Sequence, residues 1–237
     1  MTPAVFVKRY TDPSRGAAAQ ANLRWLQQLD SGVRLPHLYS GTATHLMIER
    51  LEGRLPEPAD LPELAAALGR LHGTAFAREL HAARLDRPFD TEVGTMIPDF
   101  CTGRRHVLGH LDVTPGRLPA AFYKDANLRN FLLTTSGPAL VDFDDLTLAP
   151  FGYDLAKLVV STAMTYGALP HQHIDPVLTA YTHGVETTGG PADSCTSRQL
   201  TGYAEVHHVL TARYLHRNGY RHAWPAVRPW PTPTARP

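Results

Sequence analysis

Residues 123–133 read YKDANLRNFLL, and the polar side chains of this stretch stand directly before a hydrophobic run. The run continues as NFLLTTSGPALVDFDD, which predicts a hairpin of two short strands around residues 135–138. Because a tight turn returns the chain to the edge where it began, we expect Asp125, Asn130 and Asp142 to converge. Carboxylate and amide oxygens are ligands that Mg²⁺ prefers, whereas zinc sites are built mainly from Cys and His. The stretch therefore predicts a magnesium site at one edge of the hairpin.

The composition is that of a globular protein with a sizeable core. Of the 237 residues, 43% are hydrophobic and 19% are charged, enough for one large domain or two small lobes. The 23 Lys and Arg residues balance 22 Asp and Glu residues, so no net charge favours nucleic acid or an anionic membrane as partner. Cys101 and Cys195 match no metal-binding spacing and fit a reducing compartment. With neither a signal peptide nor an apolar stretch of about 20 residues, we expect a cytoplasmic protein.

The first part of the sequence predicts a small mixed layer. VFVKRY, residues 5–10, has the β-branched and aromatic content of a strand, with Phe6, Lys8 and Tyr10 on one face. The run 17–30 has apolar residues at helical spacing, and two short strands are expected over 37–39 and 44–49. Strand, helix, strand and strand make up residues 1–53.

The second part is expected to be mainly helical. Asp60 and Glu63 form a capping-box pattern before a helix that should end at Gly73. Residues 74–117 have no usable periodicity apart from a helical piece around 75–84. Further helices are expected from Asp154 onward, over 175–184 and over 198–218, the last one ending at Asn218 and Gly219. The tail 224–237 has five prolines in fourteen residues and should not be helical.

The segment 123–156 resembles the catalytic segment of the aminoglycoside phosphotransferase and choline kinase-like family, a branch of the protein-kinase-like fold. That family has His-x-Asp, four residues, Asn, a hydrophobic strand, Asp-Phe/Trp-acid and then aromatic-Asp-Leu-Ala. Here the corresponding parts are YKD, the Asn five positions after the Asp, LVDFDD and GYDLAKL. The family order extends over residues 5–165, with 85–117 matching loosely. The resemblance implies an α+β, two-lobed fold with a reduced N-lobe over 1–53 and a helical C-lobe over 54–237 that carries the catalytic hairpin.

The resemblance also implies roles for the polar residues, with ATP and Mg²⁺ as cofactors. Asp125 would accept or orient the proton of the substrate hydroxyl, while Asn130 and Asp142 would hold Mg²⁺ ions that bridge the ATP phosphates. Asp144 is either a further metal ligand or part of a turn. Asp154 would brace the catalytic loop.

Contacts to the nucleotide follow from the same resemblance. VFVKRY resembles the strand whose lysine, here Lys8, contacts the α- and β-phosphates. LMIERLEG, residues 46–53, resembles the hinge whose backbone binds adenine, which implies contacts from Ile48, Glu49 and Leu51. Lys124 either neutralises the transferred phosphoryl group beside Asp125 or faces solvent.

The sequence departs from the family pattern in three places. Tyr123 stands where the family has a loop-supporting His. The helix that should supply a glutamate for Lys8 has Ala19 and Gln20 there, so we expect the lysine to be oriented by an amide or by nothing. Only seven residues precede Lys8, too few for two strands and a phosphate-covering turn. Three explanations for the missing strands are open: the start codon is misplaced, a partner chain completes the N-lobe, or phosphoryl transfer has been lost.

The acceptor is expected to be neutral or anionic. From residue 156 onward, seven Lys and Arg residues stand against four Asp and Glu residues, the wrong sign for a polycationic aminoglycoside. The segment 214–224, YLHRNGYRHAW, either contacts the acceptor or forms a surface helix. The sequence predicts an ATP- and Mg²⁺-dependent phosphotransferase acting on a hydroxyl of a small metabolite or peptide. The alternatives are a catalytically inactive kinase-like scaffold subunit of a biosynthetic complex, and nucleotidyl transfer.

Overall fold

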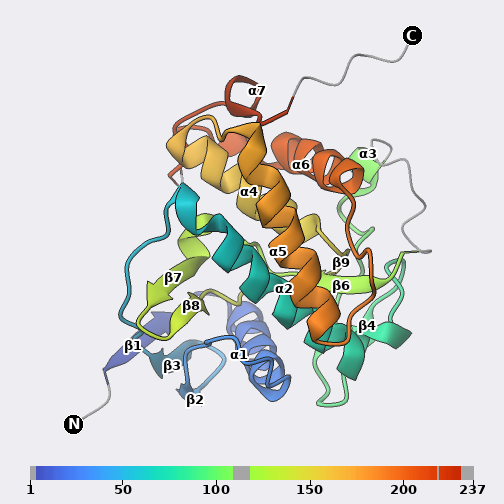
Figure 1. Ribbon diagram of the computed structural model, residues 1–237. Helices are drawn as coiled ribbons and strands as arrows, with labels where there is room; N and C mark the ends of the chain where they lie inside the picture. Colours follow the sequence, from blue (N-terminus) through green and yellow to red (C-terminus); the bar gives the residue numbers. More distant parts are fainter. Residues whose placement is uncertain (1–3, 109–117, 218, 231–237) are drawn as a thin grey trace.

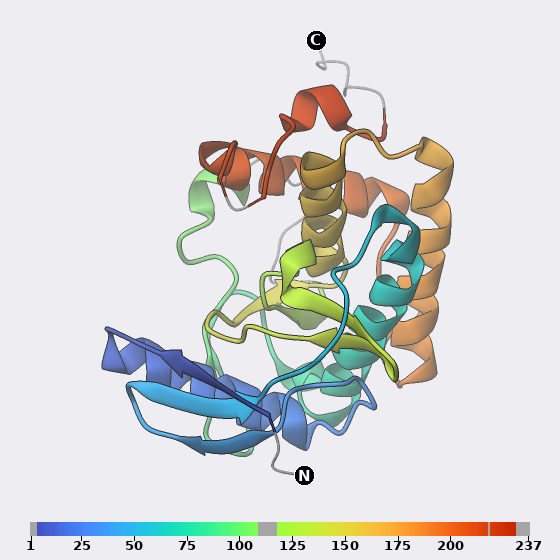
Figure 2. The same cartoon turned by 90° about the vertical axis from the view of Figure 1, so that its left-hand side faces the viewer.

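A three-stranded antiparallel sheet near the N-terminus holds the lysine strand. The computed structural model describes residues 4–108, 118–217 and 219–230. Strands β1 (Val5–Arg9), β3 (His45–Glu49) and β2 (Leu38–Gly41) lie side by side in that order, and helix α1 (Pro13–Gln28) packs against β2 and β3. Figure 2 shows this sheet and α1 as one layer beside the rest of the chain. The strands and helix expected in this part of the sequence are therefore confirmed.

The expected hairpin forms beside this layer. It pairs β7 (Phe131–Thr134) with β8 (Gly137–Leu140), in a register that sets Phe131 opposite Leu140. A second antiparallel pair, β6 (Ala120–Tyr123) with β9 (Thr147–Pro150), brackets the hairpin and was not predicted. The short pair β4 (Phe89–Asp90) and β5 (Met96–Ile97) lies within residues 74–117, where no periodicity predicted a strand.

Helices make up most of the remaining structure (Figure 1). The long ones are α2 (Leu61–Arg78), α4 (Tyr153–Tyr166), α5 (Ile174–Thr187) and α6 (Ser197–Thr211), and α2 packs along α5. Helix α4 is buried along nearly its whole length, so it forms the centre of the core. Short helices and 3-10 turns complete the chain: η1 (Pro58–Asp60), η2 (Leu80–Ala82), α3 (Arg105–Leu108), η4 (Leu128–Asn130), η5 (His171–His173), η6 (Ala212–Tyr214) and α7 (Trp224–Val227). In the part of the chain that is described, no helix combines the length and the apolar character needed to cross a bilayer.

Two expectations about α2 are wrong. The helix passes through Gly73 and ends at Arg78, because this glycine lies at a close approach of α2 to α5 rather than at a helix end. The Asp60 side chain does not cap α2. It accepts a 2.7 Å hydrogen bond from the Glu57 backbone N–H in the preceding 3-10 turn and pairs with Arg54 at 2.7 Å.

The C-terminal expectations also need correction. Helix α6 ends at Thr211, well before the predicted end, and is followed by the 3-10 turn η6; Asn218 lies outside the described residues. The tail is not free of helix, because Trp224–Val227 form α7. Its proline lies in the first turn, where the missing N–H costs little, and Trp224 is fully buried. Residues 231–237 lie outside the described residues.

A buried carboxylate joins helix α4 to the loop that follows β6. Asp154 is fully buried, and its two oxygens accept hydrogen bonds from the backbone N–H groups of Ala126 at 2.7 Å and Lys124 at 3.1 Å. The expectation that this residue braces the loop is confirmed. Burial raises the pKa of Asp154 to about 6.

Replacing Gly73 with alanine should destabilise the protein, although alanine is normally the better helix former. A Cβ atom there would lie 2.3 Å from the Val185 carbonyl oxygen and the Thr188 hydroxyl, so α2 and α5 would have to separate. We expect Gly73→Ala to lower the free energy of unfolding by about 1–3 kcal/mol, measured by urea denaturation. Gly69→Ala, whose Cβ would lie 2.2 Å from the Tyr181 carbonyl oxygen, should act in the same direction. Unchanged or higher stability in both variants would contradict the close approach of the two helices.

The raised pKa of Asp154 predicts a pH dependence of stability. Between about pH 4 and the folded-state pKa of about 6, the folded protein keeps a proton that the unfolded chain releases, so this carboxyl makes stability fall as pH rises. Asp154→Asn lacks that contribution. Relative to wild type, the variant should therefore gain up to about 3 kcal/mol in free energy of unfolding from pH 4 to pH 7. Denaturant titrations of both proteins at several pH values measure this difference, and a flat difference would contradict the assignment.

Candidate active site

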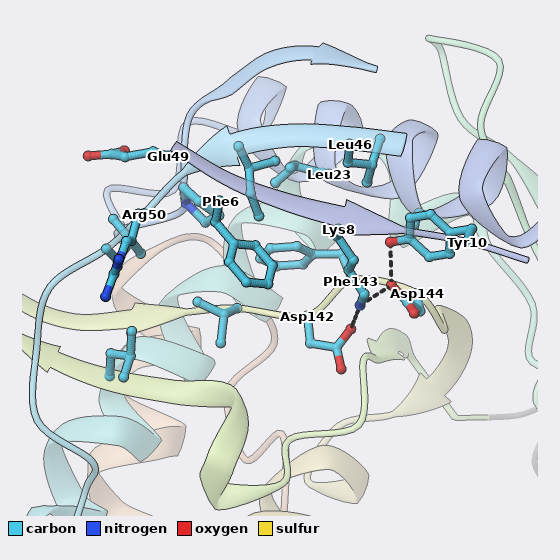
Figure 3. A pocket seen from close by; sticks show the side chains of 16 residues that line it. Phe6, Lys8, Tyr10, Leu23, Leu46, Glu49, Arg50, Asp142, Phe143 and Asp144 are labelled. Atoms are coloured by element: carbon cyan, nitrogen blue, oxygen red, sulfur yellow. Dashed lines mark hydrogen bonds and ion pairs between the residues drawn. The ribbon is translucent and has the colours of Figure 1, made fainter. Parts of the chain in front are cut away.

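A cavity of about 420 Å³ lies between the N-terminal sheet and the hairpin (Figure 3). Its walls are mostly apolar. Phe6, Leu46 and Ile48 come from the sheet, while Leu132 and Val141 come from the hairpin and the residues after it. The volume is in the range of ligand-binding pockets in proteins. The predicted strand face is confirmed, because the side chains of alternate β1 residues, beginning with Phe6, line this cavity.

One end of the cavity is the segment predicted to be the hinge. Ile48, Glu49 and Leu51 all line it. The Glu49 carboxylate is engaged by Arg34 and by the His37 backbone N–H at 3.1 Å, and these contacts outweigh burial and lower its pKa. The backbone N–H of Glu49 is bonded to the His37 carbonyl oxygen at 2.8 Å. Among the described residues, the Leu51 N–H has no hydrogen-bond partner, so this hinge donor is available to a ligand.

The other end of the cavity holds Lys8 between two carboxylates. Its Nζ lies 2.6 Å from an oxygen of Asp142 and 2.6 Å from an oxygen of Asp144 (Figure 3). Tyr10 donates a 2.8 Å hydrogen bond to the same Asp144 oxygen. Burial lowers the pKa of Lys8, but the hydrogen bonds that its ammonium donates to the two carboxylates outweigh burial and leave that pKa above its usual value. The expectation that Lys8 is oriented by an amide or by nothing is therefore wrong.

Asp142, Asp144 and Asn130 offer oxygen atoms of the kind that Mg²⁺ prefers as ligands. The Lys8 ammonium shows that one cation can reach both Asp142 and Asp144. The backbone carbonyl oxygen of Asn130 accepts from the backbone N–H of Val141 at 2.9 Å, which sets Asn130 beside the end of the hairpin. Within residues 4–108, 118–217 and 219–230, no group of three His, Cys, Asp or Glu side chains is placed to hold a metal. An ion bound here would therefore need oxygen ligands beyond the carboxylates, as Mg²⁺ does when it keeps waters and shares phosphate oxygens.

Asp125 lies on the loop between β6 and the hairpin, fixed on several sides. Its backbone carbonyl accepts from the Asn130 side-chain amide at 2.9 Å and from the Asn127 N–H at 2.6 Å. The φ angles of Asp125 and Asp142 are 61° and 66°, a left-handed conformation that is uncommon for residues with a Cβ atom. Backbone strain of this kind concentrates at functional sites. The structure thus brings Asp125, Asn130 and Asp142 together, as the hairpin pattern predicted.

One oxygen of the Asp125 carboxylate is held by two side chains. Tyr123 donates a 3.0 Å hydrogen bond to Oδ1, and the Lys157 ammonium lies 3.2 Å from the same atom. Lys157 is almost completely buried, yet its pKa is raised, because Asp125 and Tyr220 outweigh the cost of burial. Tyr123, which stands where the family has a histidine, therefore bonds directly to the candidate catalytic carboxylate.

A second cavity, of about 440 Å³, contains Asp125. Asp144 lines the first cavity and the next residue, Asp145, lines the second, so the two cavities lie on either side of the Asp142–Asp145 segment. Burial raises the pKa of Asp145, and the charges of Asp125, Asp142 and Asp144 also raise it. The carboxylates of Asp125, Asp142 and Asp144 are therefore all within electrostatic range of Asp145.

Lys124 lies in the core and lines neither cavity. It is 1% exposed, and its Nζ donates to the Val141 carbonyl oxygen at 3.2 Å, with the rings of Phe131 and Phe143 at 5.6 and 5.4 Å. Burial lowers its pKa. The solvent-facing alternative is wrong. A direct contact with the nucleotide has no support either, because the buried ammonium is bonded to the Val141 carbonyl oxygen and reaches neither cavity.

Two residues of the site were missed by sequence reasoning although a local signal existed. Lys157 follows Asp154 by three residues on α4, a spacing that places both on one face of a helix. Tyr10 follows Lys8 by two residues, on the same side of the strand. Tyr220 belongs to the segment 214–224, for which the sequence predicted an acceptor contact or a surface helix. Its side chain is instead buried, and its hydroxyl accepts from the Asn127 amide at 2.9 Å.

Comparisons with known proteins agree with this arrangement. The sequence model described as "Phosphotransferase enzyme family" matches residues 3–187. A comparison with curated protein sequences finds no match.

Several solved structures have a similar chain fold. An amicoumacin kinase, hAmiN, in complex with AMP-PNP, Ca²⁺ and Ami has a TM-score of 0.56 at 14% identity, covering 90% of this chain and 73% of that chain. The macrolide 2'-phosphotransferase MphH from Brachybacterium faecium has a TM-score of 0.55 at 16% identity, covering 97% and 86%. The choline kinase LicA from Streptococcus pneumoniae has a TM-score of 0.55 at 16% identity, covering 89% and 76%. The chain therefore belongs to the phosphotransferase enzyme family, as the resemblance implied, and has the two-part α+β architecture of the protein-kinase-like fold.

Proposed function

We propose that the protein is an ATP- and Mg²⁺-dependent phosphotransferase that acts on a hydroxyl group of a small molecule. The observation that carries this proposal is the position of the Asp142–Asp145 segment between two cavities, one containing Lys8 and the other containing Asp125. Transfer between two substrates needs such a shared boundary. Membership of the phosphotransferase family and the AMP-PNP and AMP complexes among similar structures support the choice of nucleotide.

The first cavity would hold ATP. Its apolar walls suit a purine ring, and the Leu51 N–H is a donor at the hinge end. The Lys8 ammonium at the opposite end would then contact the phosphates. This orientation directs the terminal phosphate toward Asp125.

Asn130, Asp142 and Asp144 would hold Mg²⁺, which when bound neutralises charge on the phosphates. Lys8 now occupies the space between the two carboxylates. Its ammonium would move from them to the phosphates in the complex, an exchange that keeps each charge paired.

Asp125 would orient the acceptor hydroxyl. Tyr123 and Lys157 both engage Oδ1, and Oδ2 has no partner among the described residues. Oδ2 is thus available to the acceptor O–H. As the acceptor oxygen bonds to the γ-phosphorus, the bond between that phosphorus and the β,γ-bridging oxygen breaks, ADP leaves, and the hydroxyl proton passes to Asp125.

The N-terminal sheet has a free edge beside the nucleotide cavity. Strand β1 lies at that edge, and Val5, Phe6 and Val7 are 39%, 50% and 43% exposed. We predict that a partner chain adds strands at this edge and is required for activity. Full activity of the isolated chain would contradict this requirement. The absence of both nucleotide binding and turnover would favour the scaffold alternative.

Nucleotide binding can be measured as a change in stability. At a ligand concentration of a hundred times Kd, MgATP should add about 2.7 kcal/mol to the free energy of unfolding. Asp142→Asn should lose the Mg²⁺-dependent part of this gain, read out by thermal unfolding with ATP in Mg²⁺ or EDTA. Asp86→Asn, an acid paired with Arg84 away from both cavities, is the matched control and should behave as wild type. A gain that does not depend on Mg²⁺, or that survives in Asp142→Asn, would contradict the assignment of the metal ligands.

The role of Asp125 is tested by separating binding from turnover. Asp125→Asn should keep the stability gain with MgATP, because the residue lies outside the nucleotide cavity. Turnover, measured as ADP release with an acceptor, should fall by a factor of about 10²–10⁴, the usual contribution of acid–base catalysis. Unchanged turnover in this variant would remove Asp125 from the mechanism.

A further inference from the structure

We propose that the natural acceptor is a small hydroxyl compound that carries an oxyanion, a carboxylate or a phosphate, bound by Arg104 in the second cavity. This inference rests on the proposed function, because it takes the cavity that contains Asp125 as the acceptor site. It goes beyond that function by assigning the charge of the acceptor and the residue that binds the charged group.

Arg104 is held in a fixed orientation in the wall of this cavity. Its guanidinium donates to the Phe100 carbonyl oxygen at 3.1 Å and to the Thr147 hydroxyl at 3.0 Å. The rings of Phe100, Tyr123 and Tyr153 lie 5.1, 5.5 and 5.7 Å from its central carbon. A guanidinium has five N–H donors, so donors remain for a ligand. Cation–π contacts and hydrogen bonds order the side chain before any ligand arrives, which lowers the entropy cost of binding.

The charges that line this cavity leave a positive surplus. Lys157 is paired with Asp125 at 3.2 Å, and Asp145 with Arg15 at 3.2 Å. Arg104 and Arg213 also line the cavity, and neither has an acidic partner in the described part of the chain. The Arg213 guanidinium stacks on the Tyr214 ring at 4.8 Å. A cationic acceptor would meet uncompensated repulsion here, whereas an anionic acceptor would find charge complementarity.

A buried hydroxyl next to Arg104 points to the same ligand. Tyr153 is fully buried and lines the cavity, and its hydroxyl, which lies next to the Arg104 guanidinium, has no acceptor for its proton among the described residues. It lies close enough to Arg104 for the guanidinium to lower its pKa, although burial outweighs this effect and raises that pKa. Buried polar groups rarely lack a partner. An oxyanion bound to Arg104 would supply an acceptor for the Tyr153 O–H.

The anion subsite and Asp125 are connected through one side chain. The Tyr123 ring packs against Arg104, and the Tyr123 hydroxyl donates to Asp125. Thr147, which accepts a hydrogen bond from Arg104, lies opposite Tyr123 in the β6–β9 pair. A ligand anion on Arg104 would therefore place the rest of the acceptor beside the Asp125 carboxylate. The substrate would carry its hydroxyl and its anion on one small skeleton.

Binding of four matched hexoses in the absence of nucleotide tests this inference independently of phosphoryl transfer. The probes are glucose, glucosamine, glucuronate and glucose 6-phosphate, which share a ring and differ in charge, and calorimetry gives their Kd values. We expect one or both anions to bind about 10–150 times more tightly than glucose, the range for hydrogen bonds to charged groups, and glucosamine to bind most weakly. The tighter binder of glucuronate and glucose 6-phosphate shows whether the site prefers a carboxylate or a phosphate.

Variants of neighbouring arginines assign the effect. Arg104→Gln should abolish the preference for the anions, whereas Arg105→Gln, an exposed neighbour that lines no described cavity, should keep it. Because Arg104 also supports local packing, the exposed Arg213→Gln is a second variant that should weaken anion binding without a folding defect.

Equal Kd values for all four sugars in the wild type, preference for glucosamine, or an unchanged anion preference in Arg104→Gln would each overturn the proposal. If MgATP fails to stabilise the protein while anion selectivity remains, the proposed function fails and the anion site stands.

Discussion

The Asp154 carboxylate is the constraint on which the rest of the site depends. It is buried at the start of α4 and accepts two backbone hydrogen bonds from the loop that carries Asp125. Burial of an ionised carboxylate is costly, and the two backbone hydrogen bonds offset part of that cost while they hold the loop in its conformation. The left-handed backbone at Asp125 then persists because the loop is fixed on both sides, by Asp154 and by the Asn130 amide.

Lys8 supplies the second constraint, because it joins the N-terminal sheet to the hairpin. Its two short ion pairs are the direct polar link between β1 and the acids that follow β8. In a half-buried cavity these pairs are stronger than on an open surface, since fewer waters compete. The same two carboxylates would serve Mg²⁺, so the lysine and the metal share ligands. In a complex with MgATP, Lys8 would have to leave Asp142 and Asp144. Binding of Mg²⁺ would therefore be connected to the position of the N-terminal sheet, which carries Lys8.

Local sequence patterns were sufficient where the structure is built from neighbours in the chain. The hairpin, the alternation along β1 and the convergence of Asp125, Asn130 and Asp142 follow from turn chemistry and strand periodicity. The continuation of α2 through Gly73 could not be predicted, because the reason for that glycine is the backbone of α5, more than a hundred residues away. Arg104 lies in a segment without periodicity, and its role depends on aromatic rings from β6 and α4. The burial of Lys124 likewise depends on tertiary contacts that its neighbours in sequence do not reveal.

In the proposed function the two cavities separate the nucleotide from the acceptor, and the second cavity holds both the Asp125 carboxylate and the groups that would select the acceptor. The residues between the cavities, Asp142–Asp145, are fixed by the hairpin and by Lys8. Tyr123, Asp125, Tyr153 and Lys157 form the walls of the second cavity next to the proposed catalytic residue. The remaining walls come from the loop around Arg104 and from the end of α6 with η6, away from the two backbone hydrogen bonds that Asp154 accepts. Substitutions in those walls can therefore change the charge and shape of the acceptor site while the loop geometry is retained. The positive surplus proposed for the acceptor site lies partly in these remaining walls, at Arg104 and Arg213.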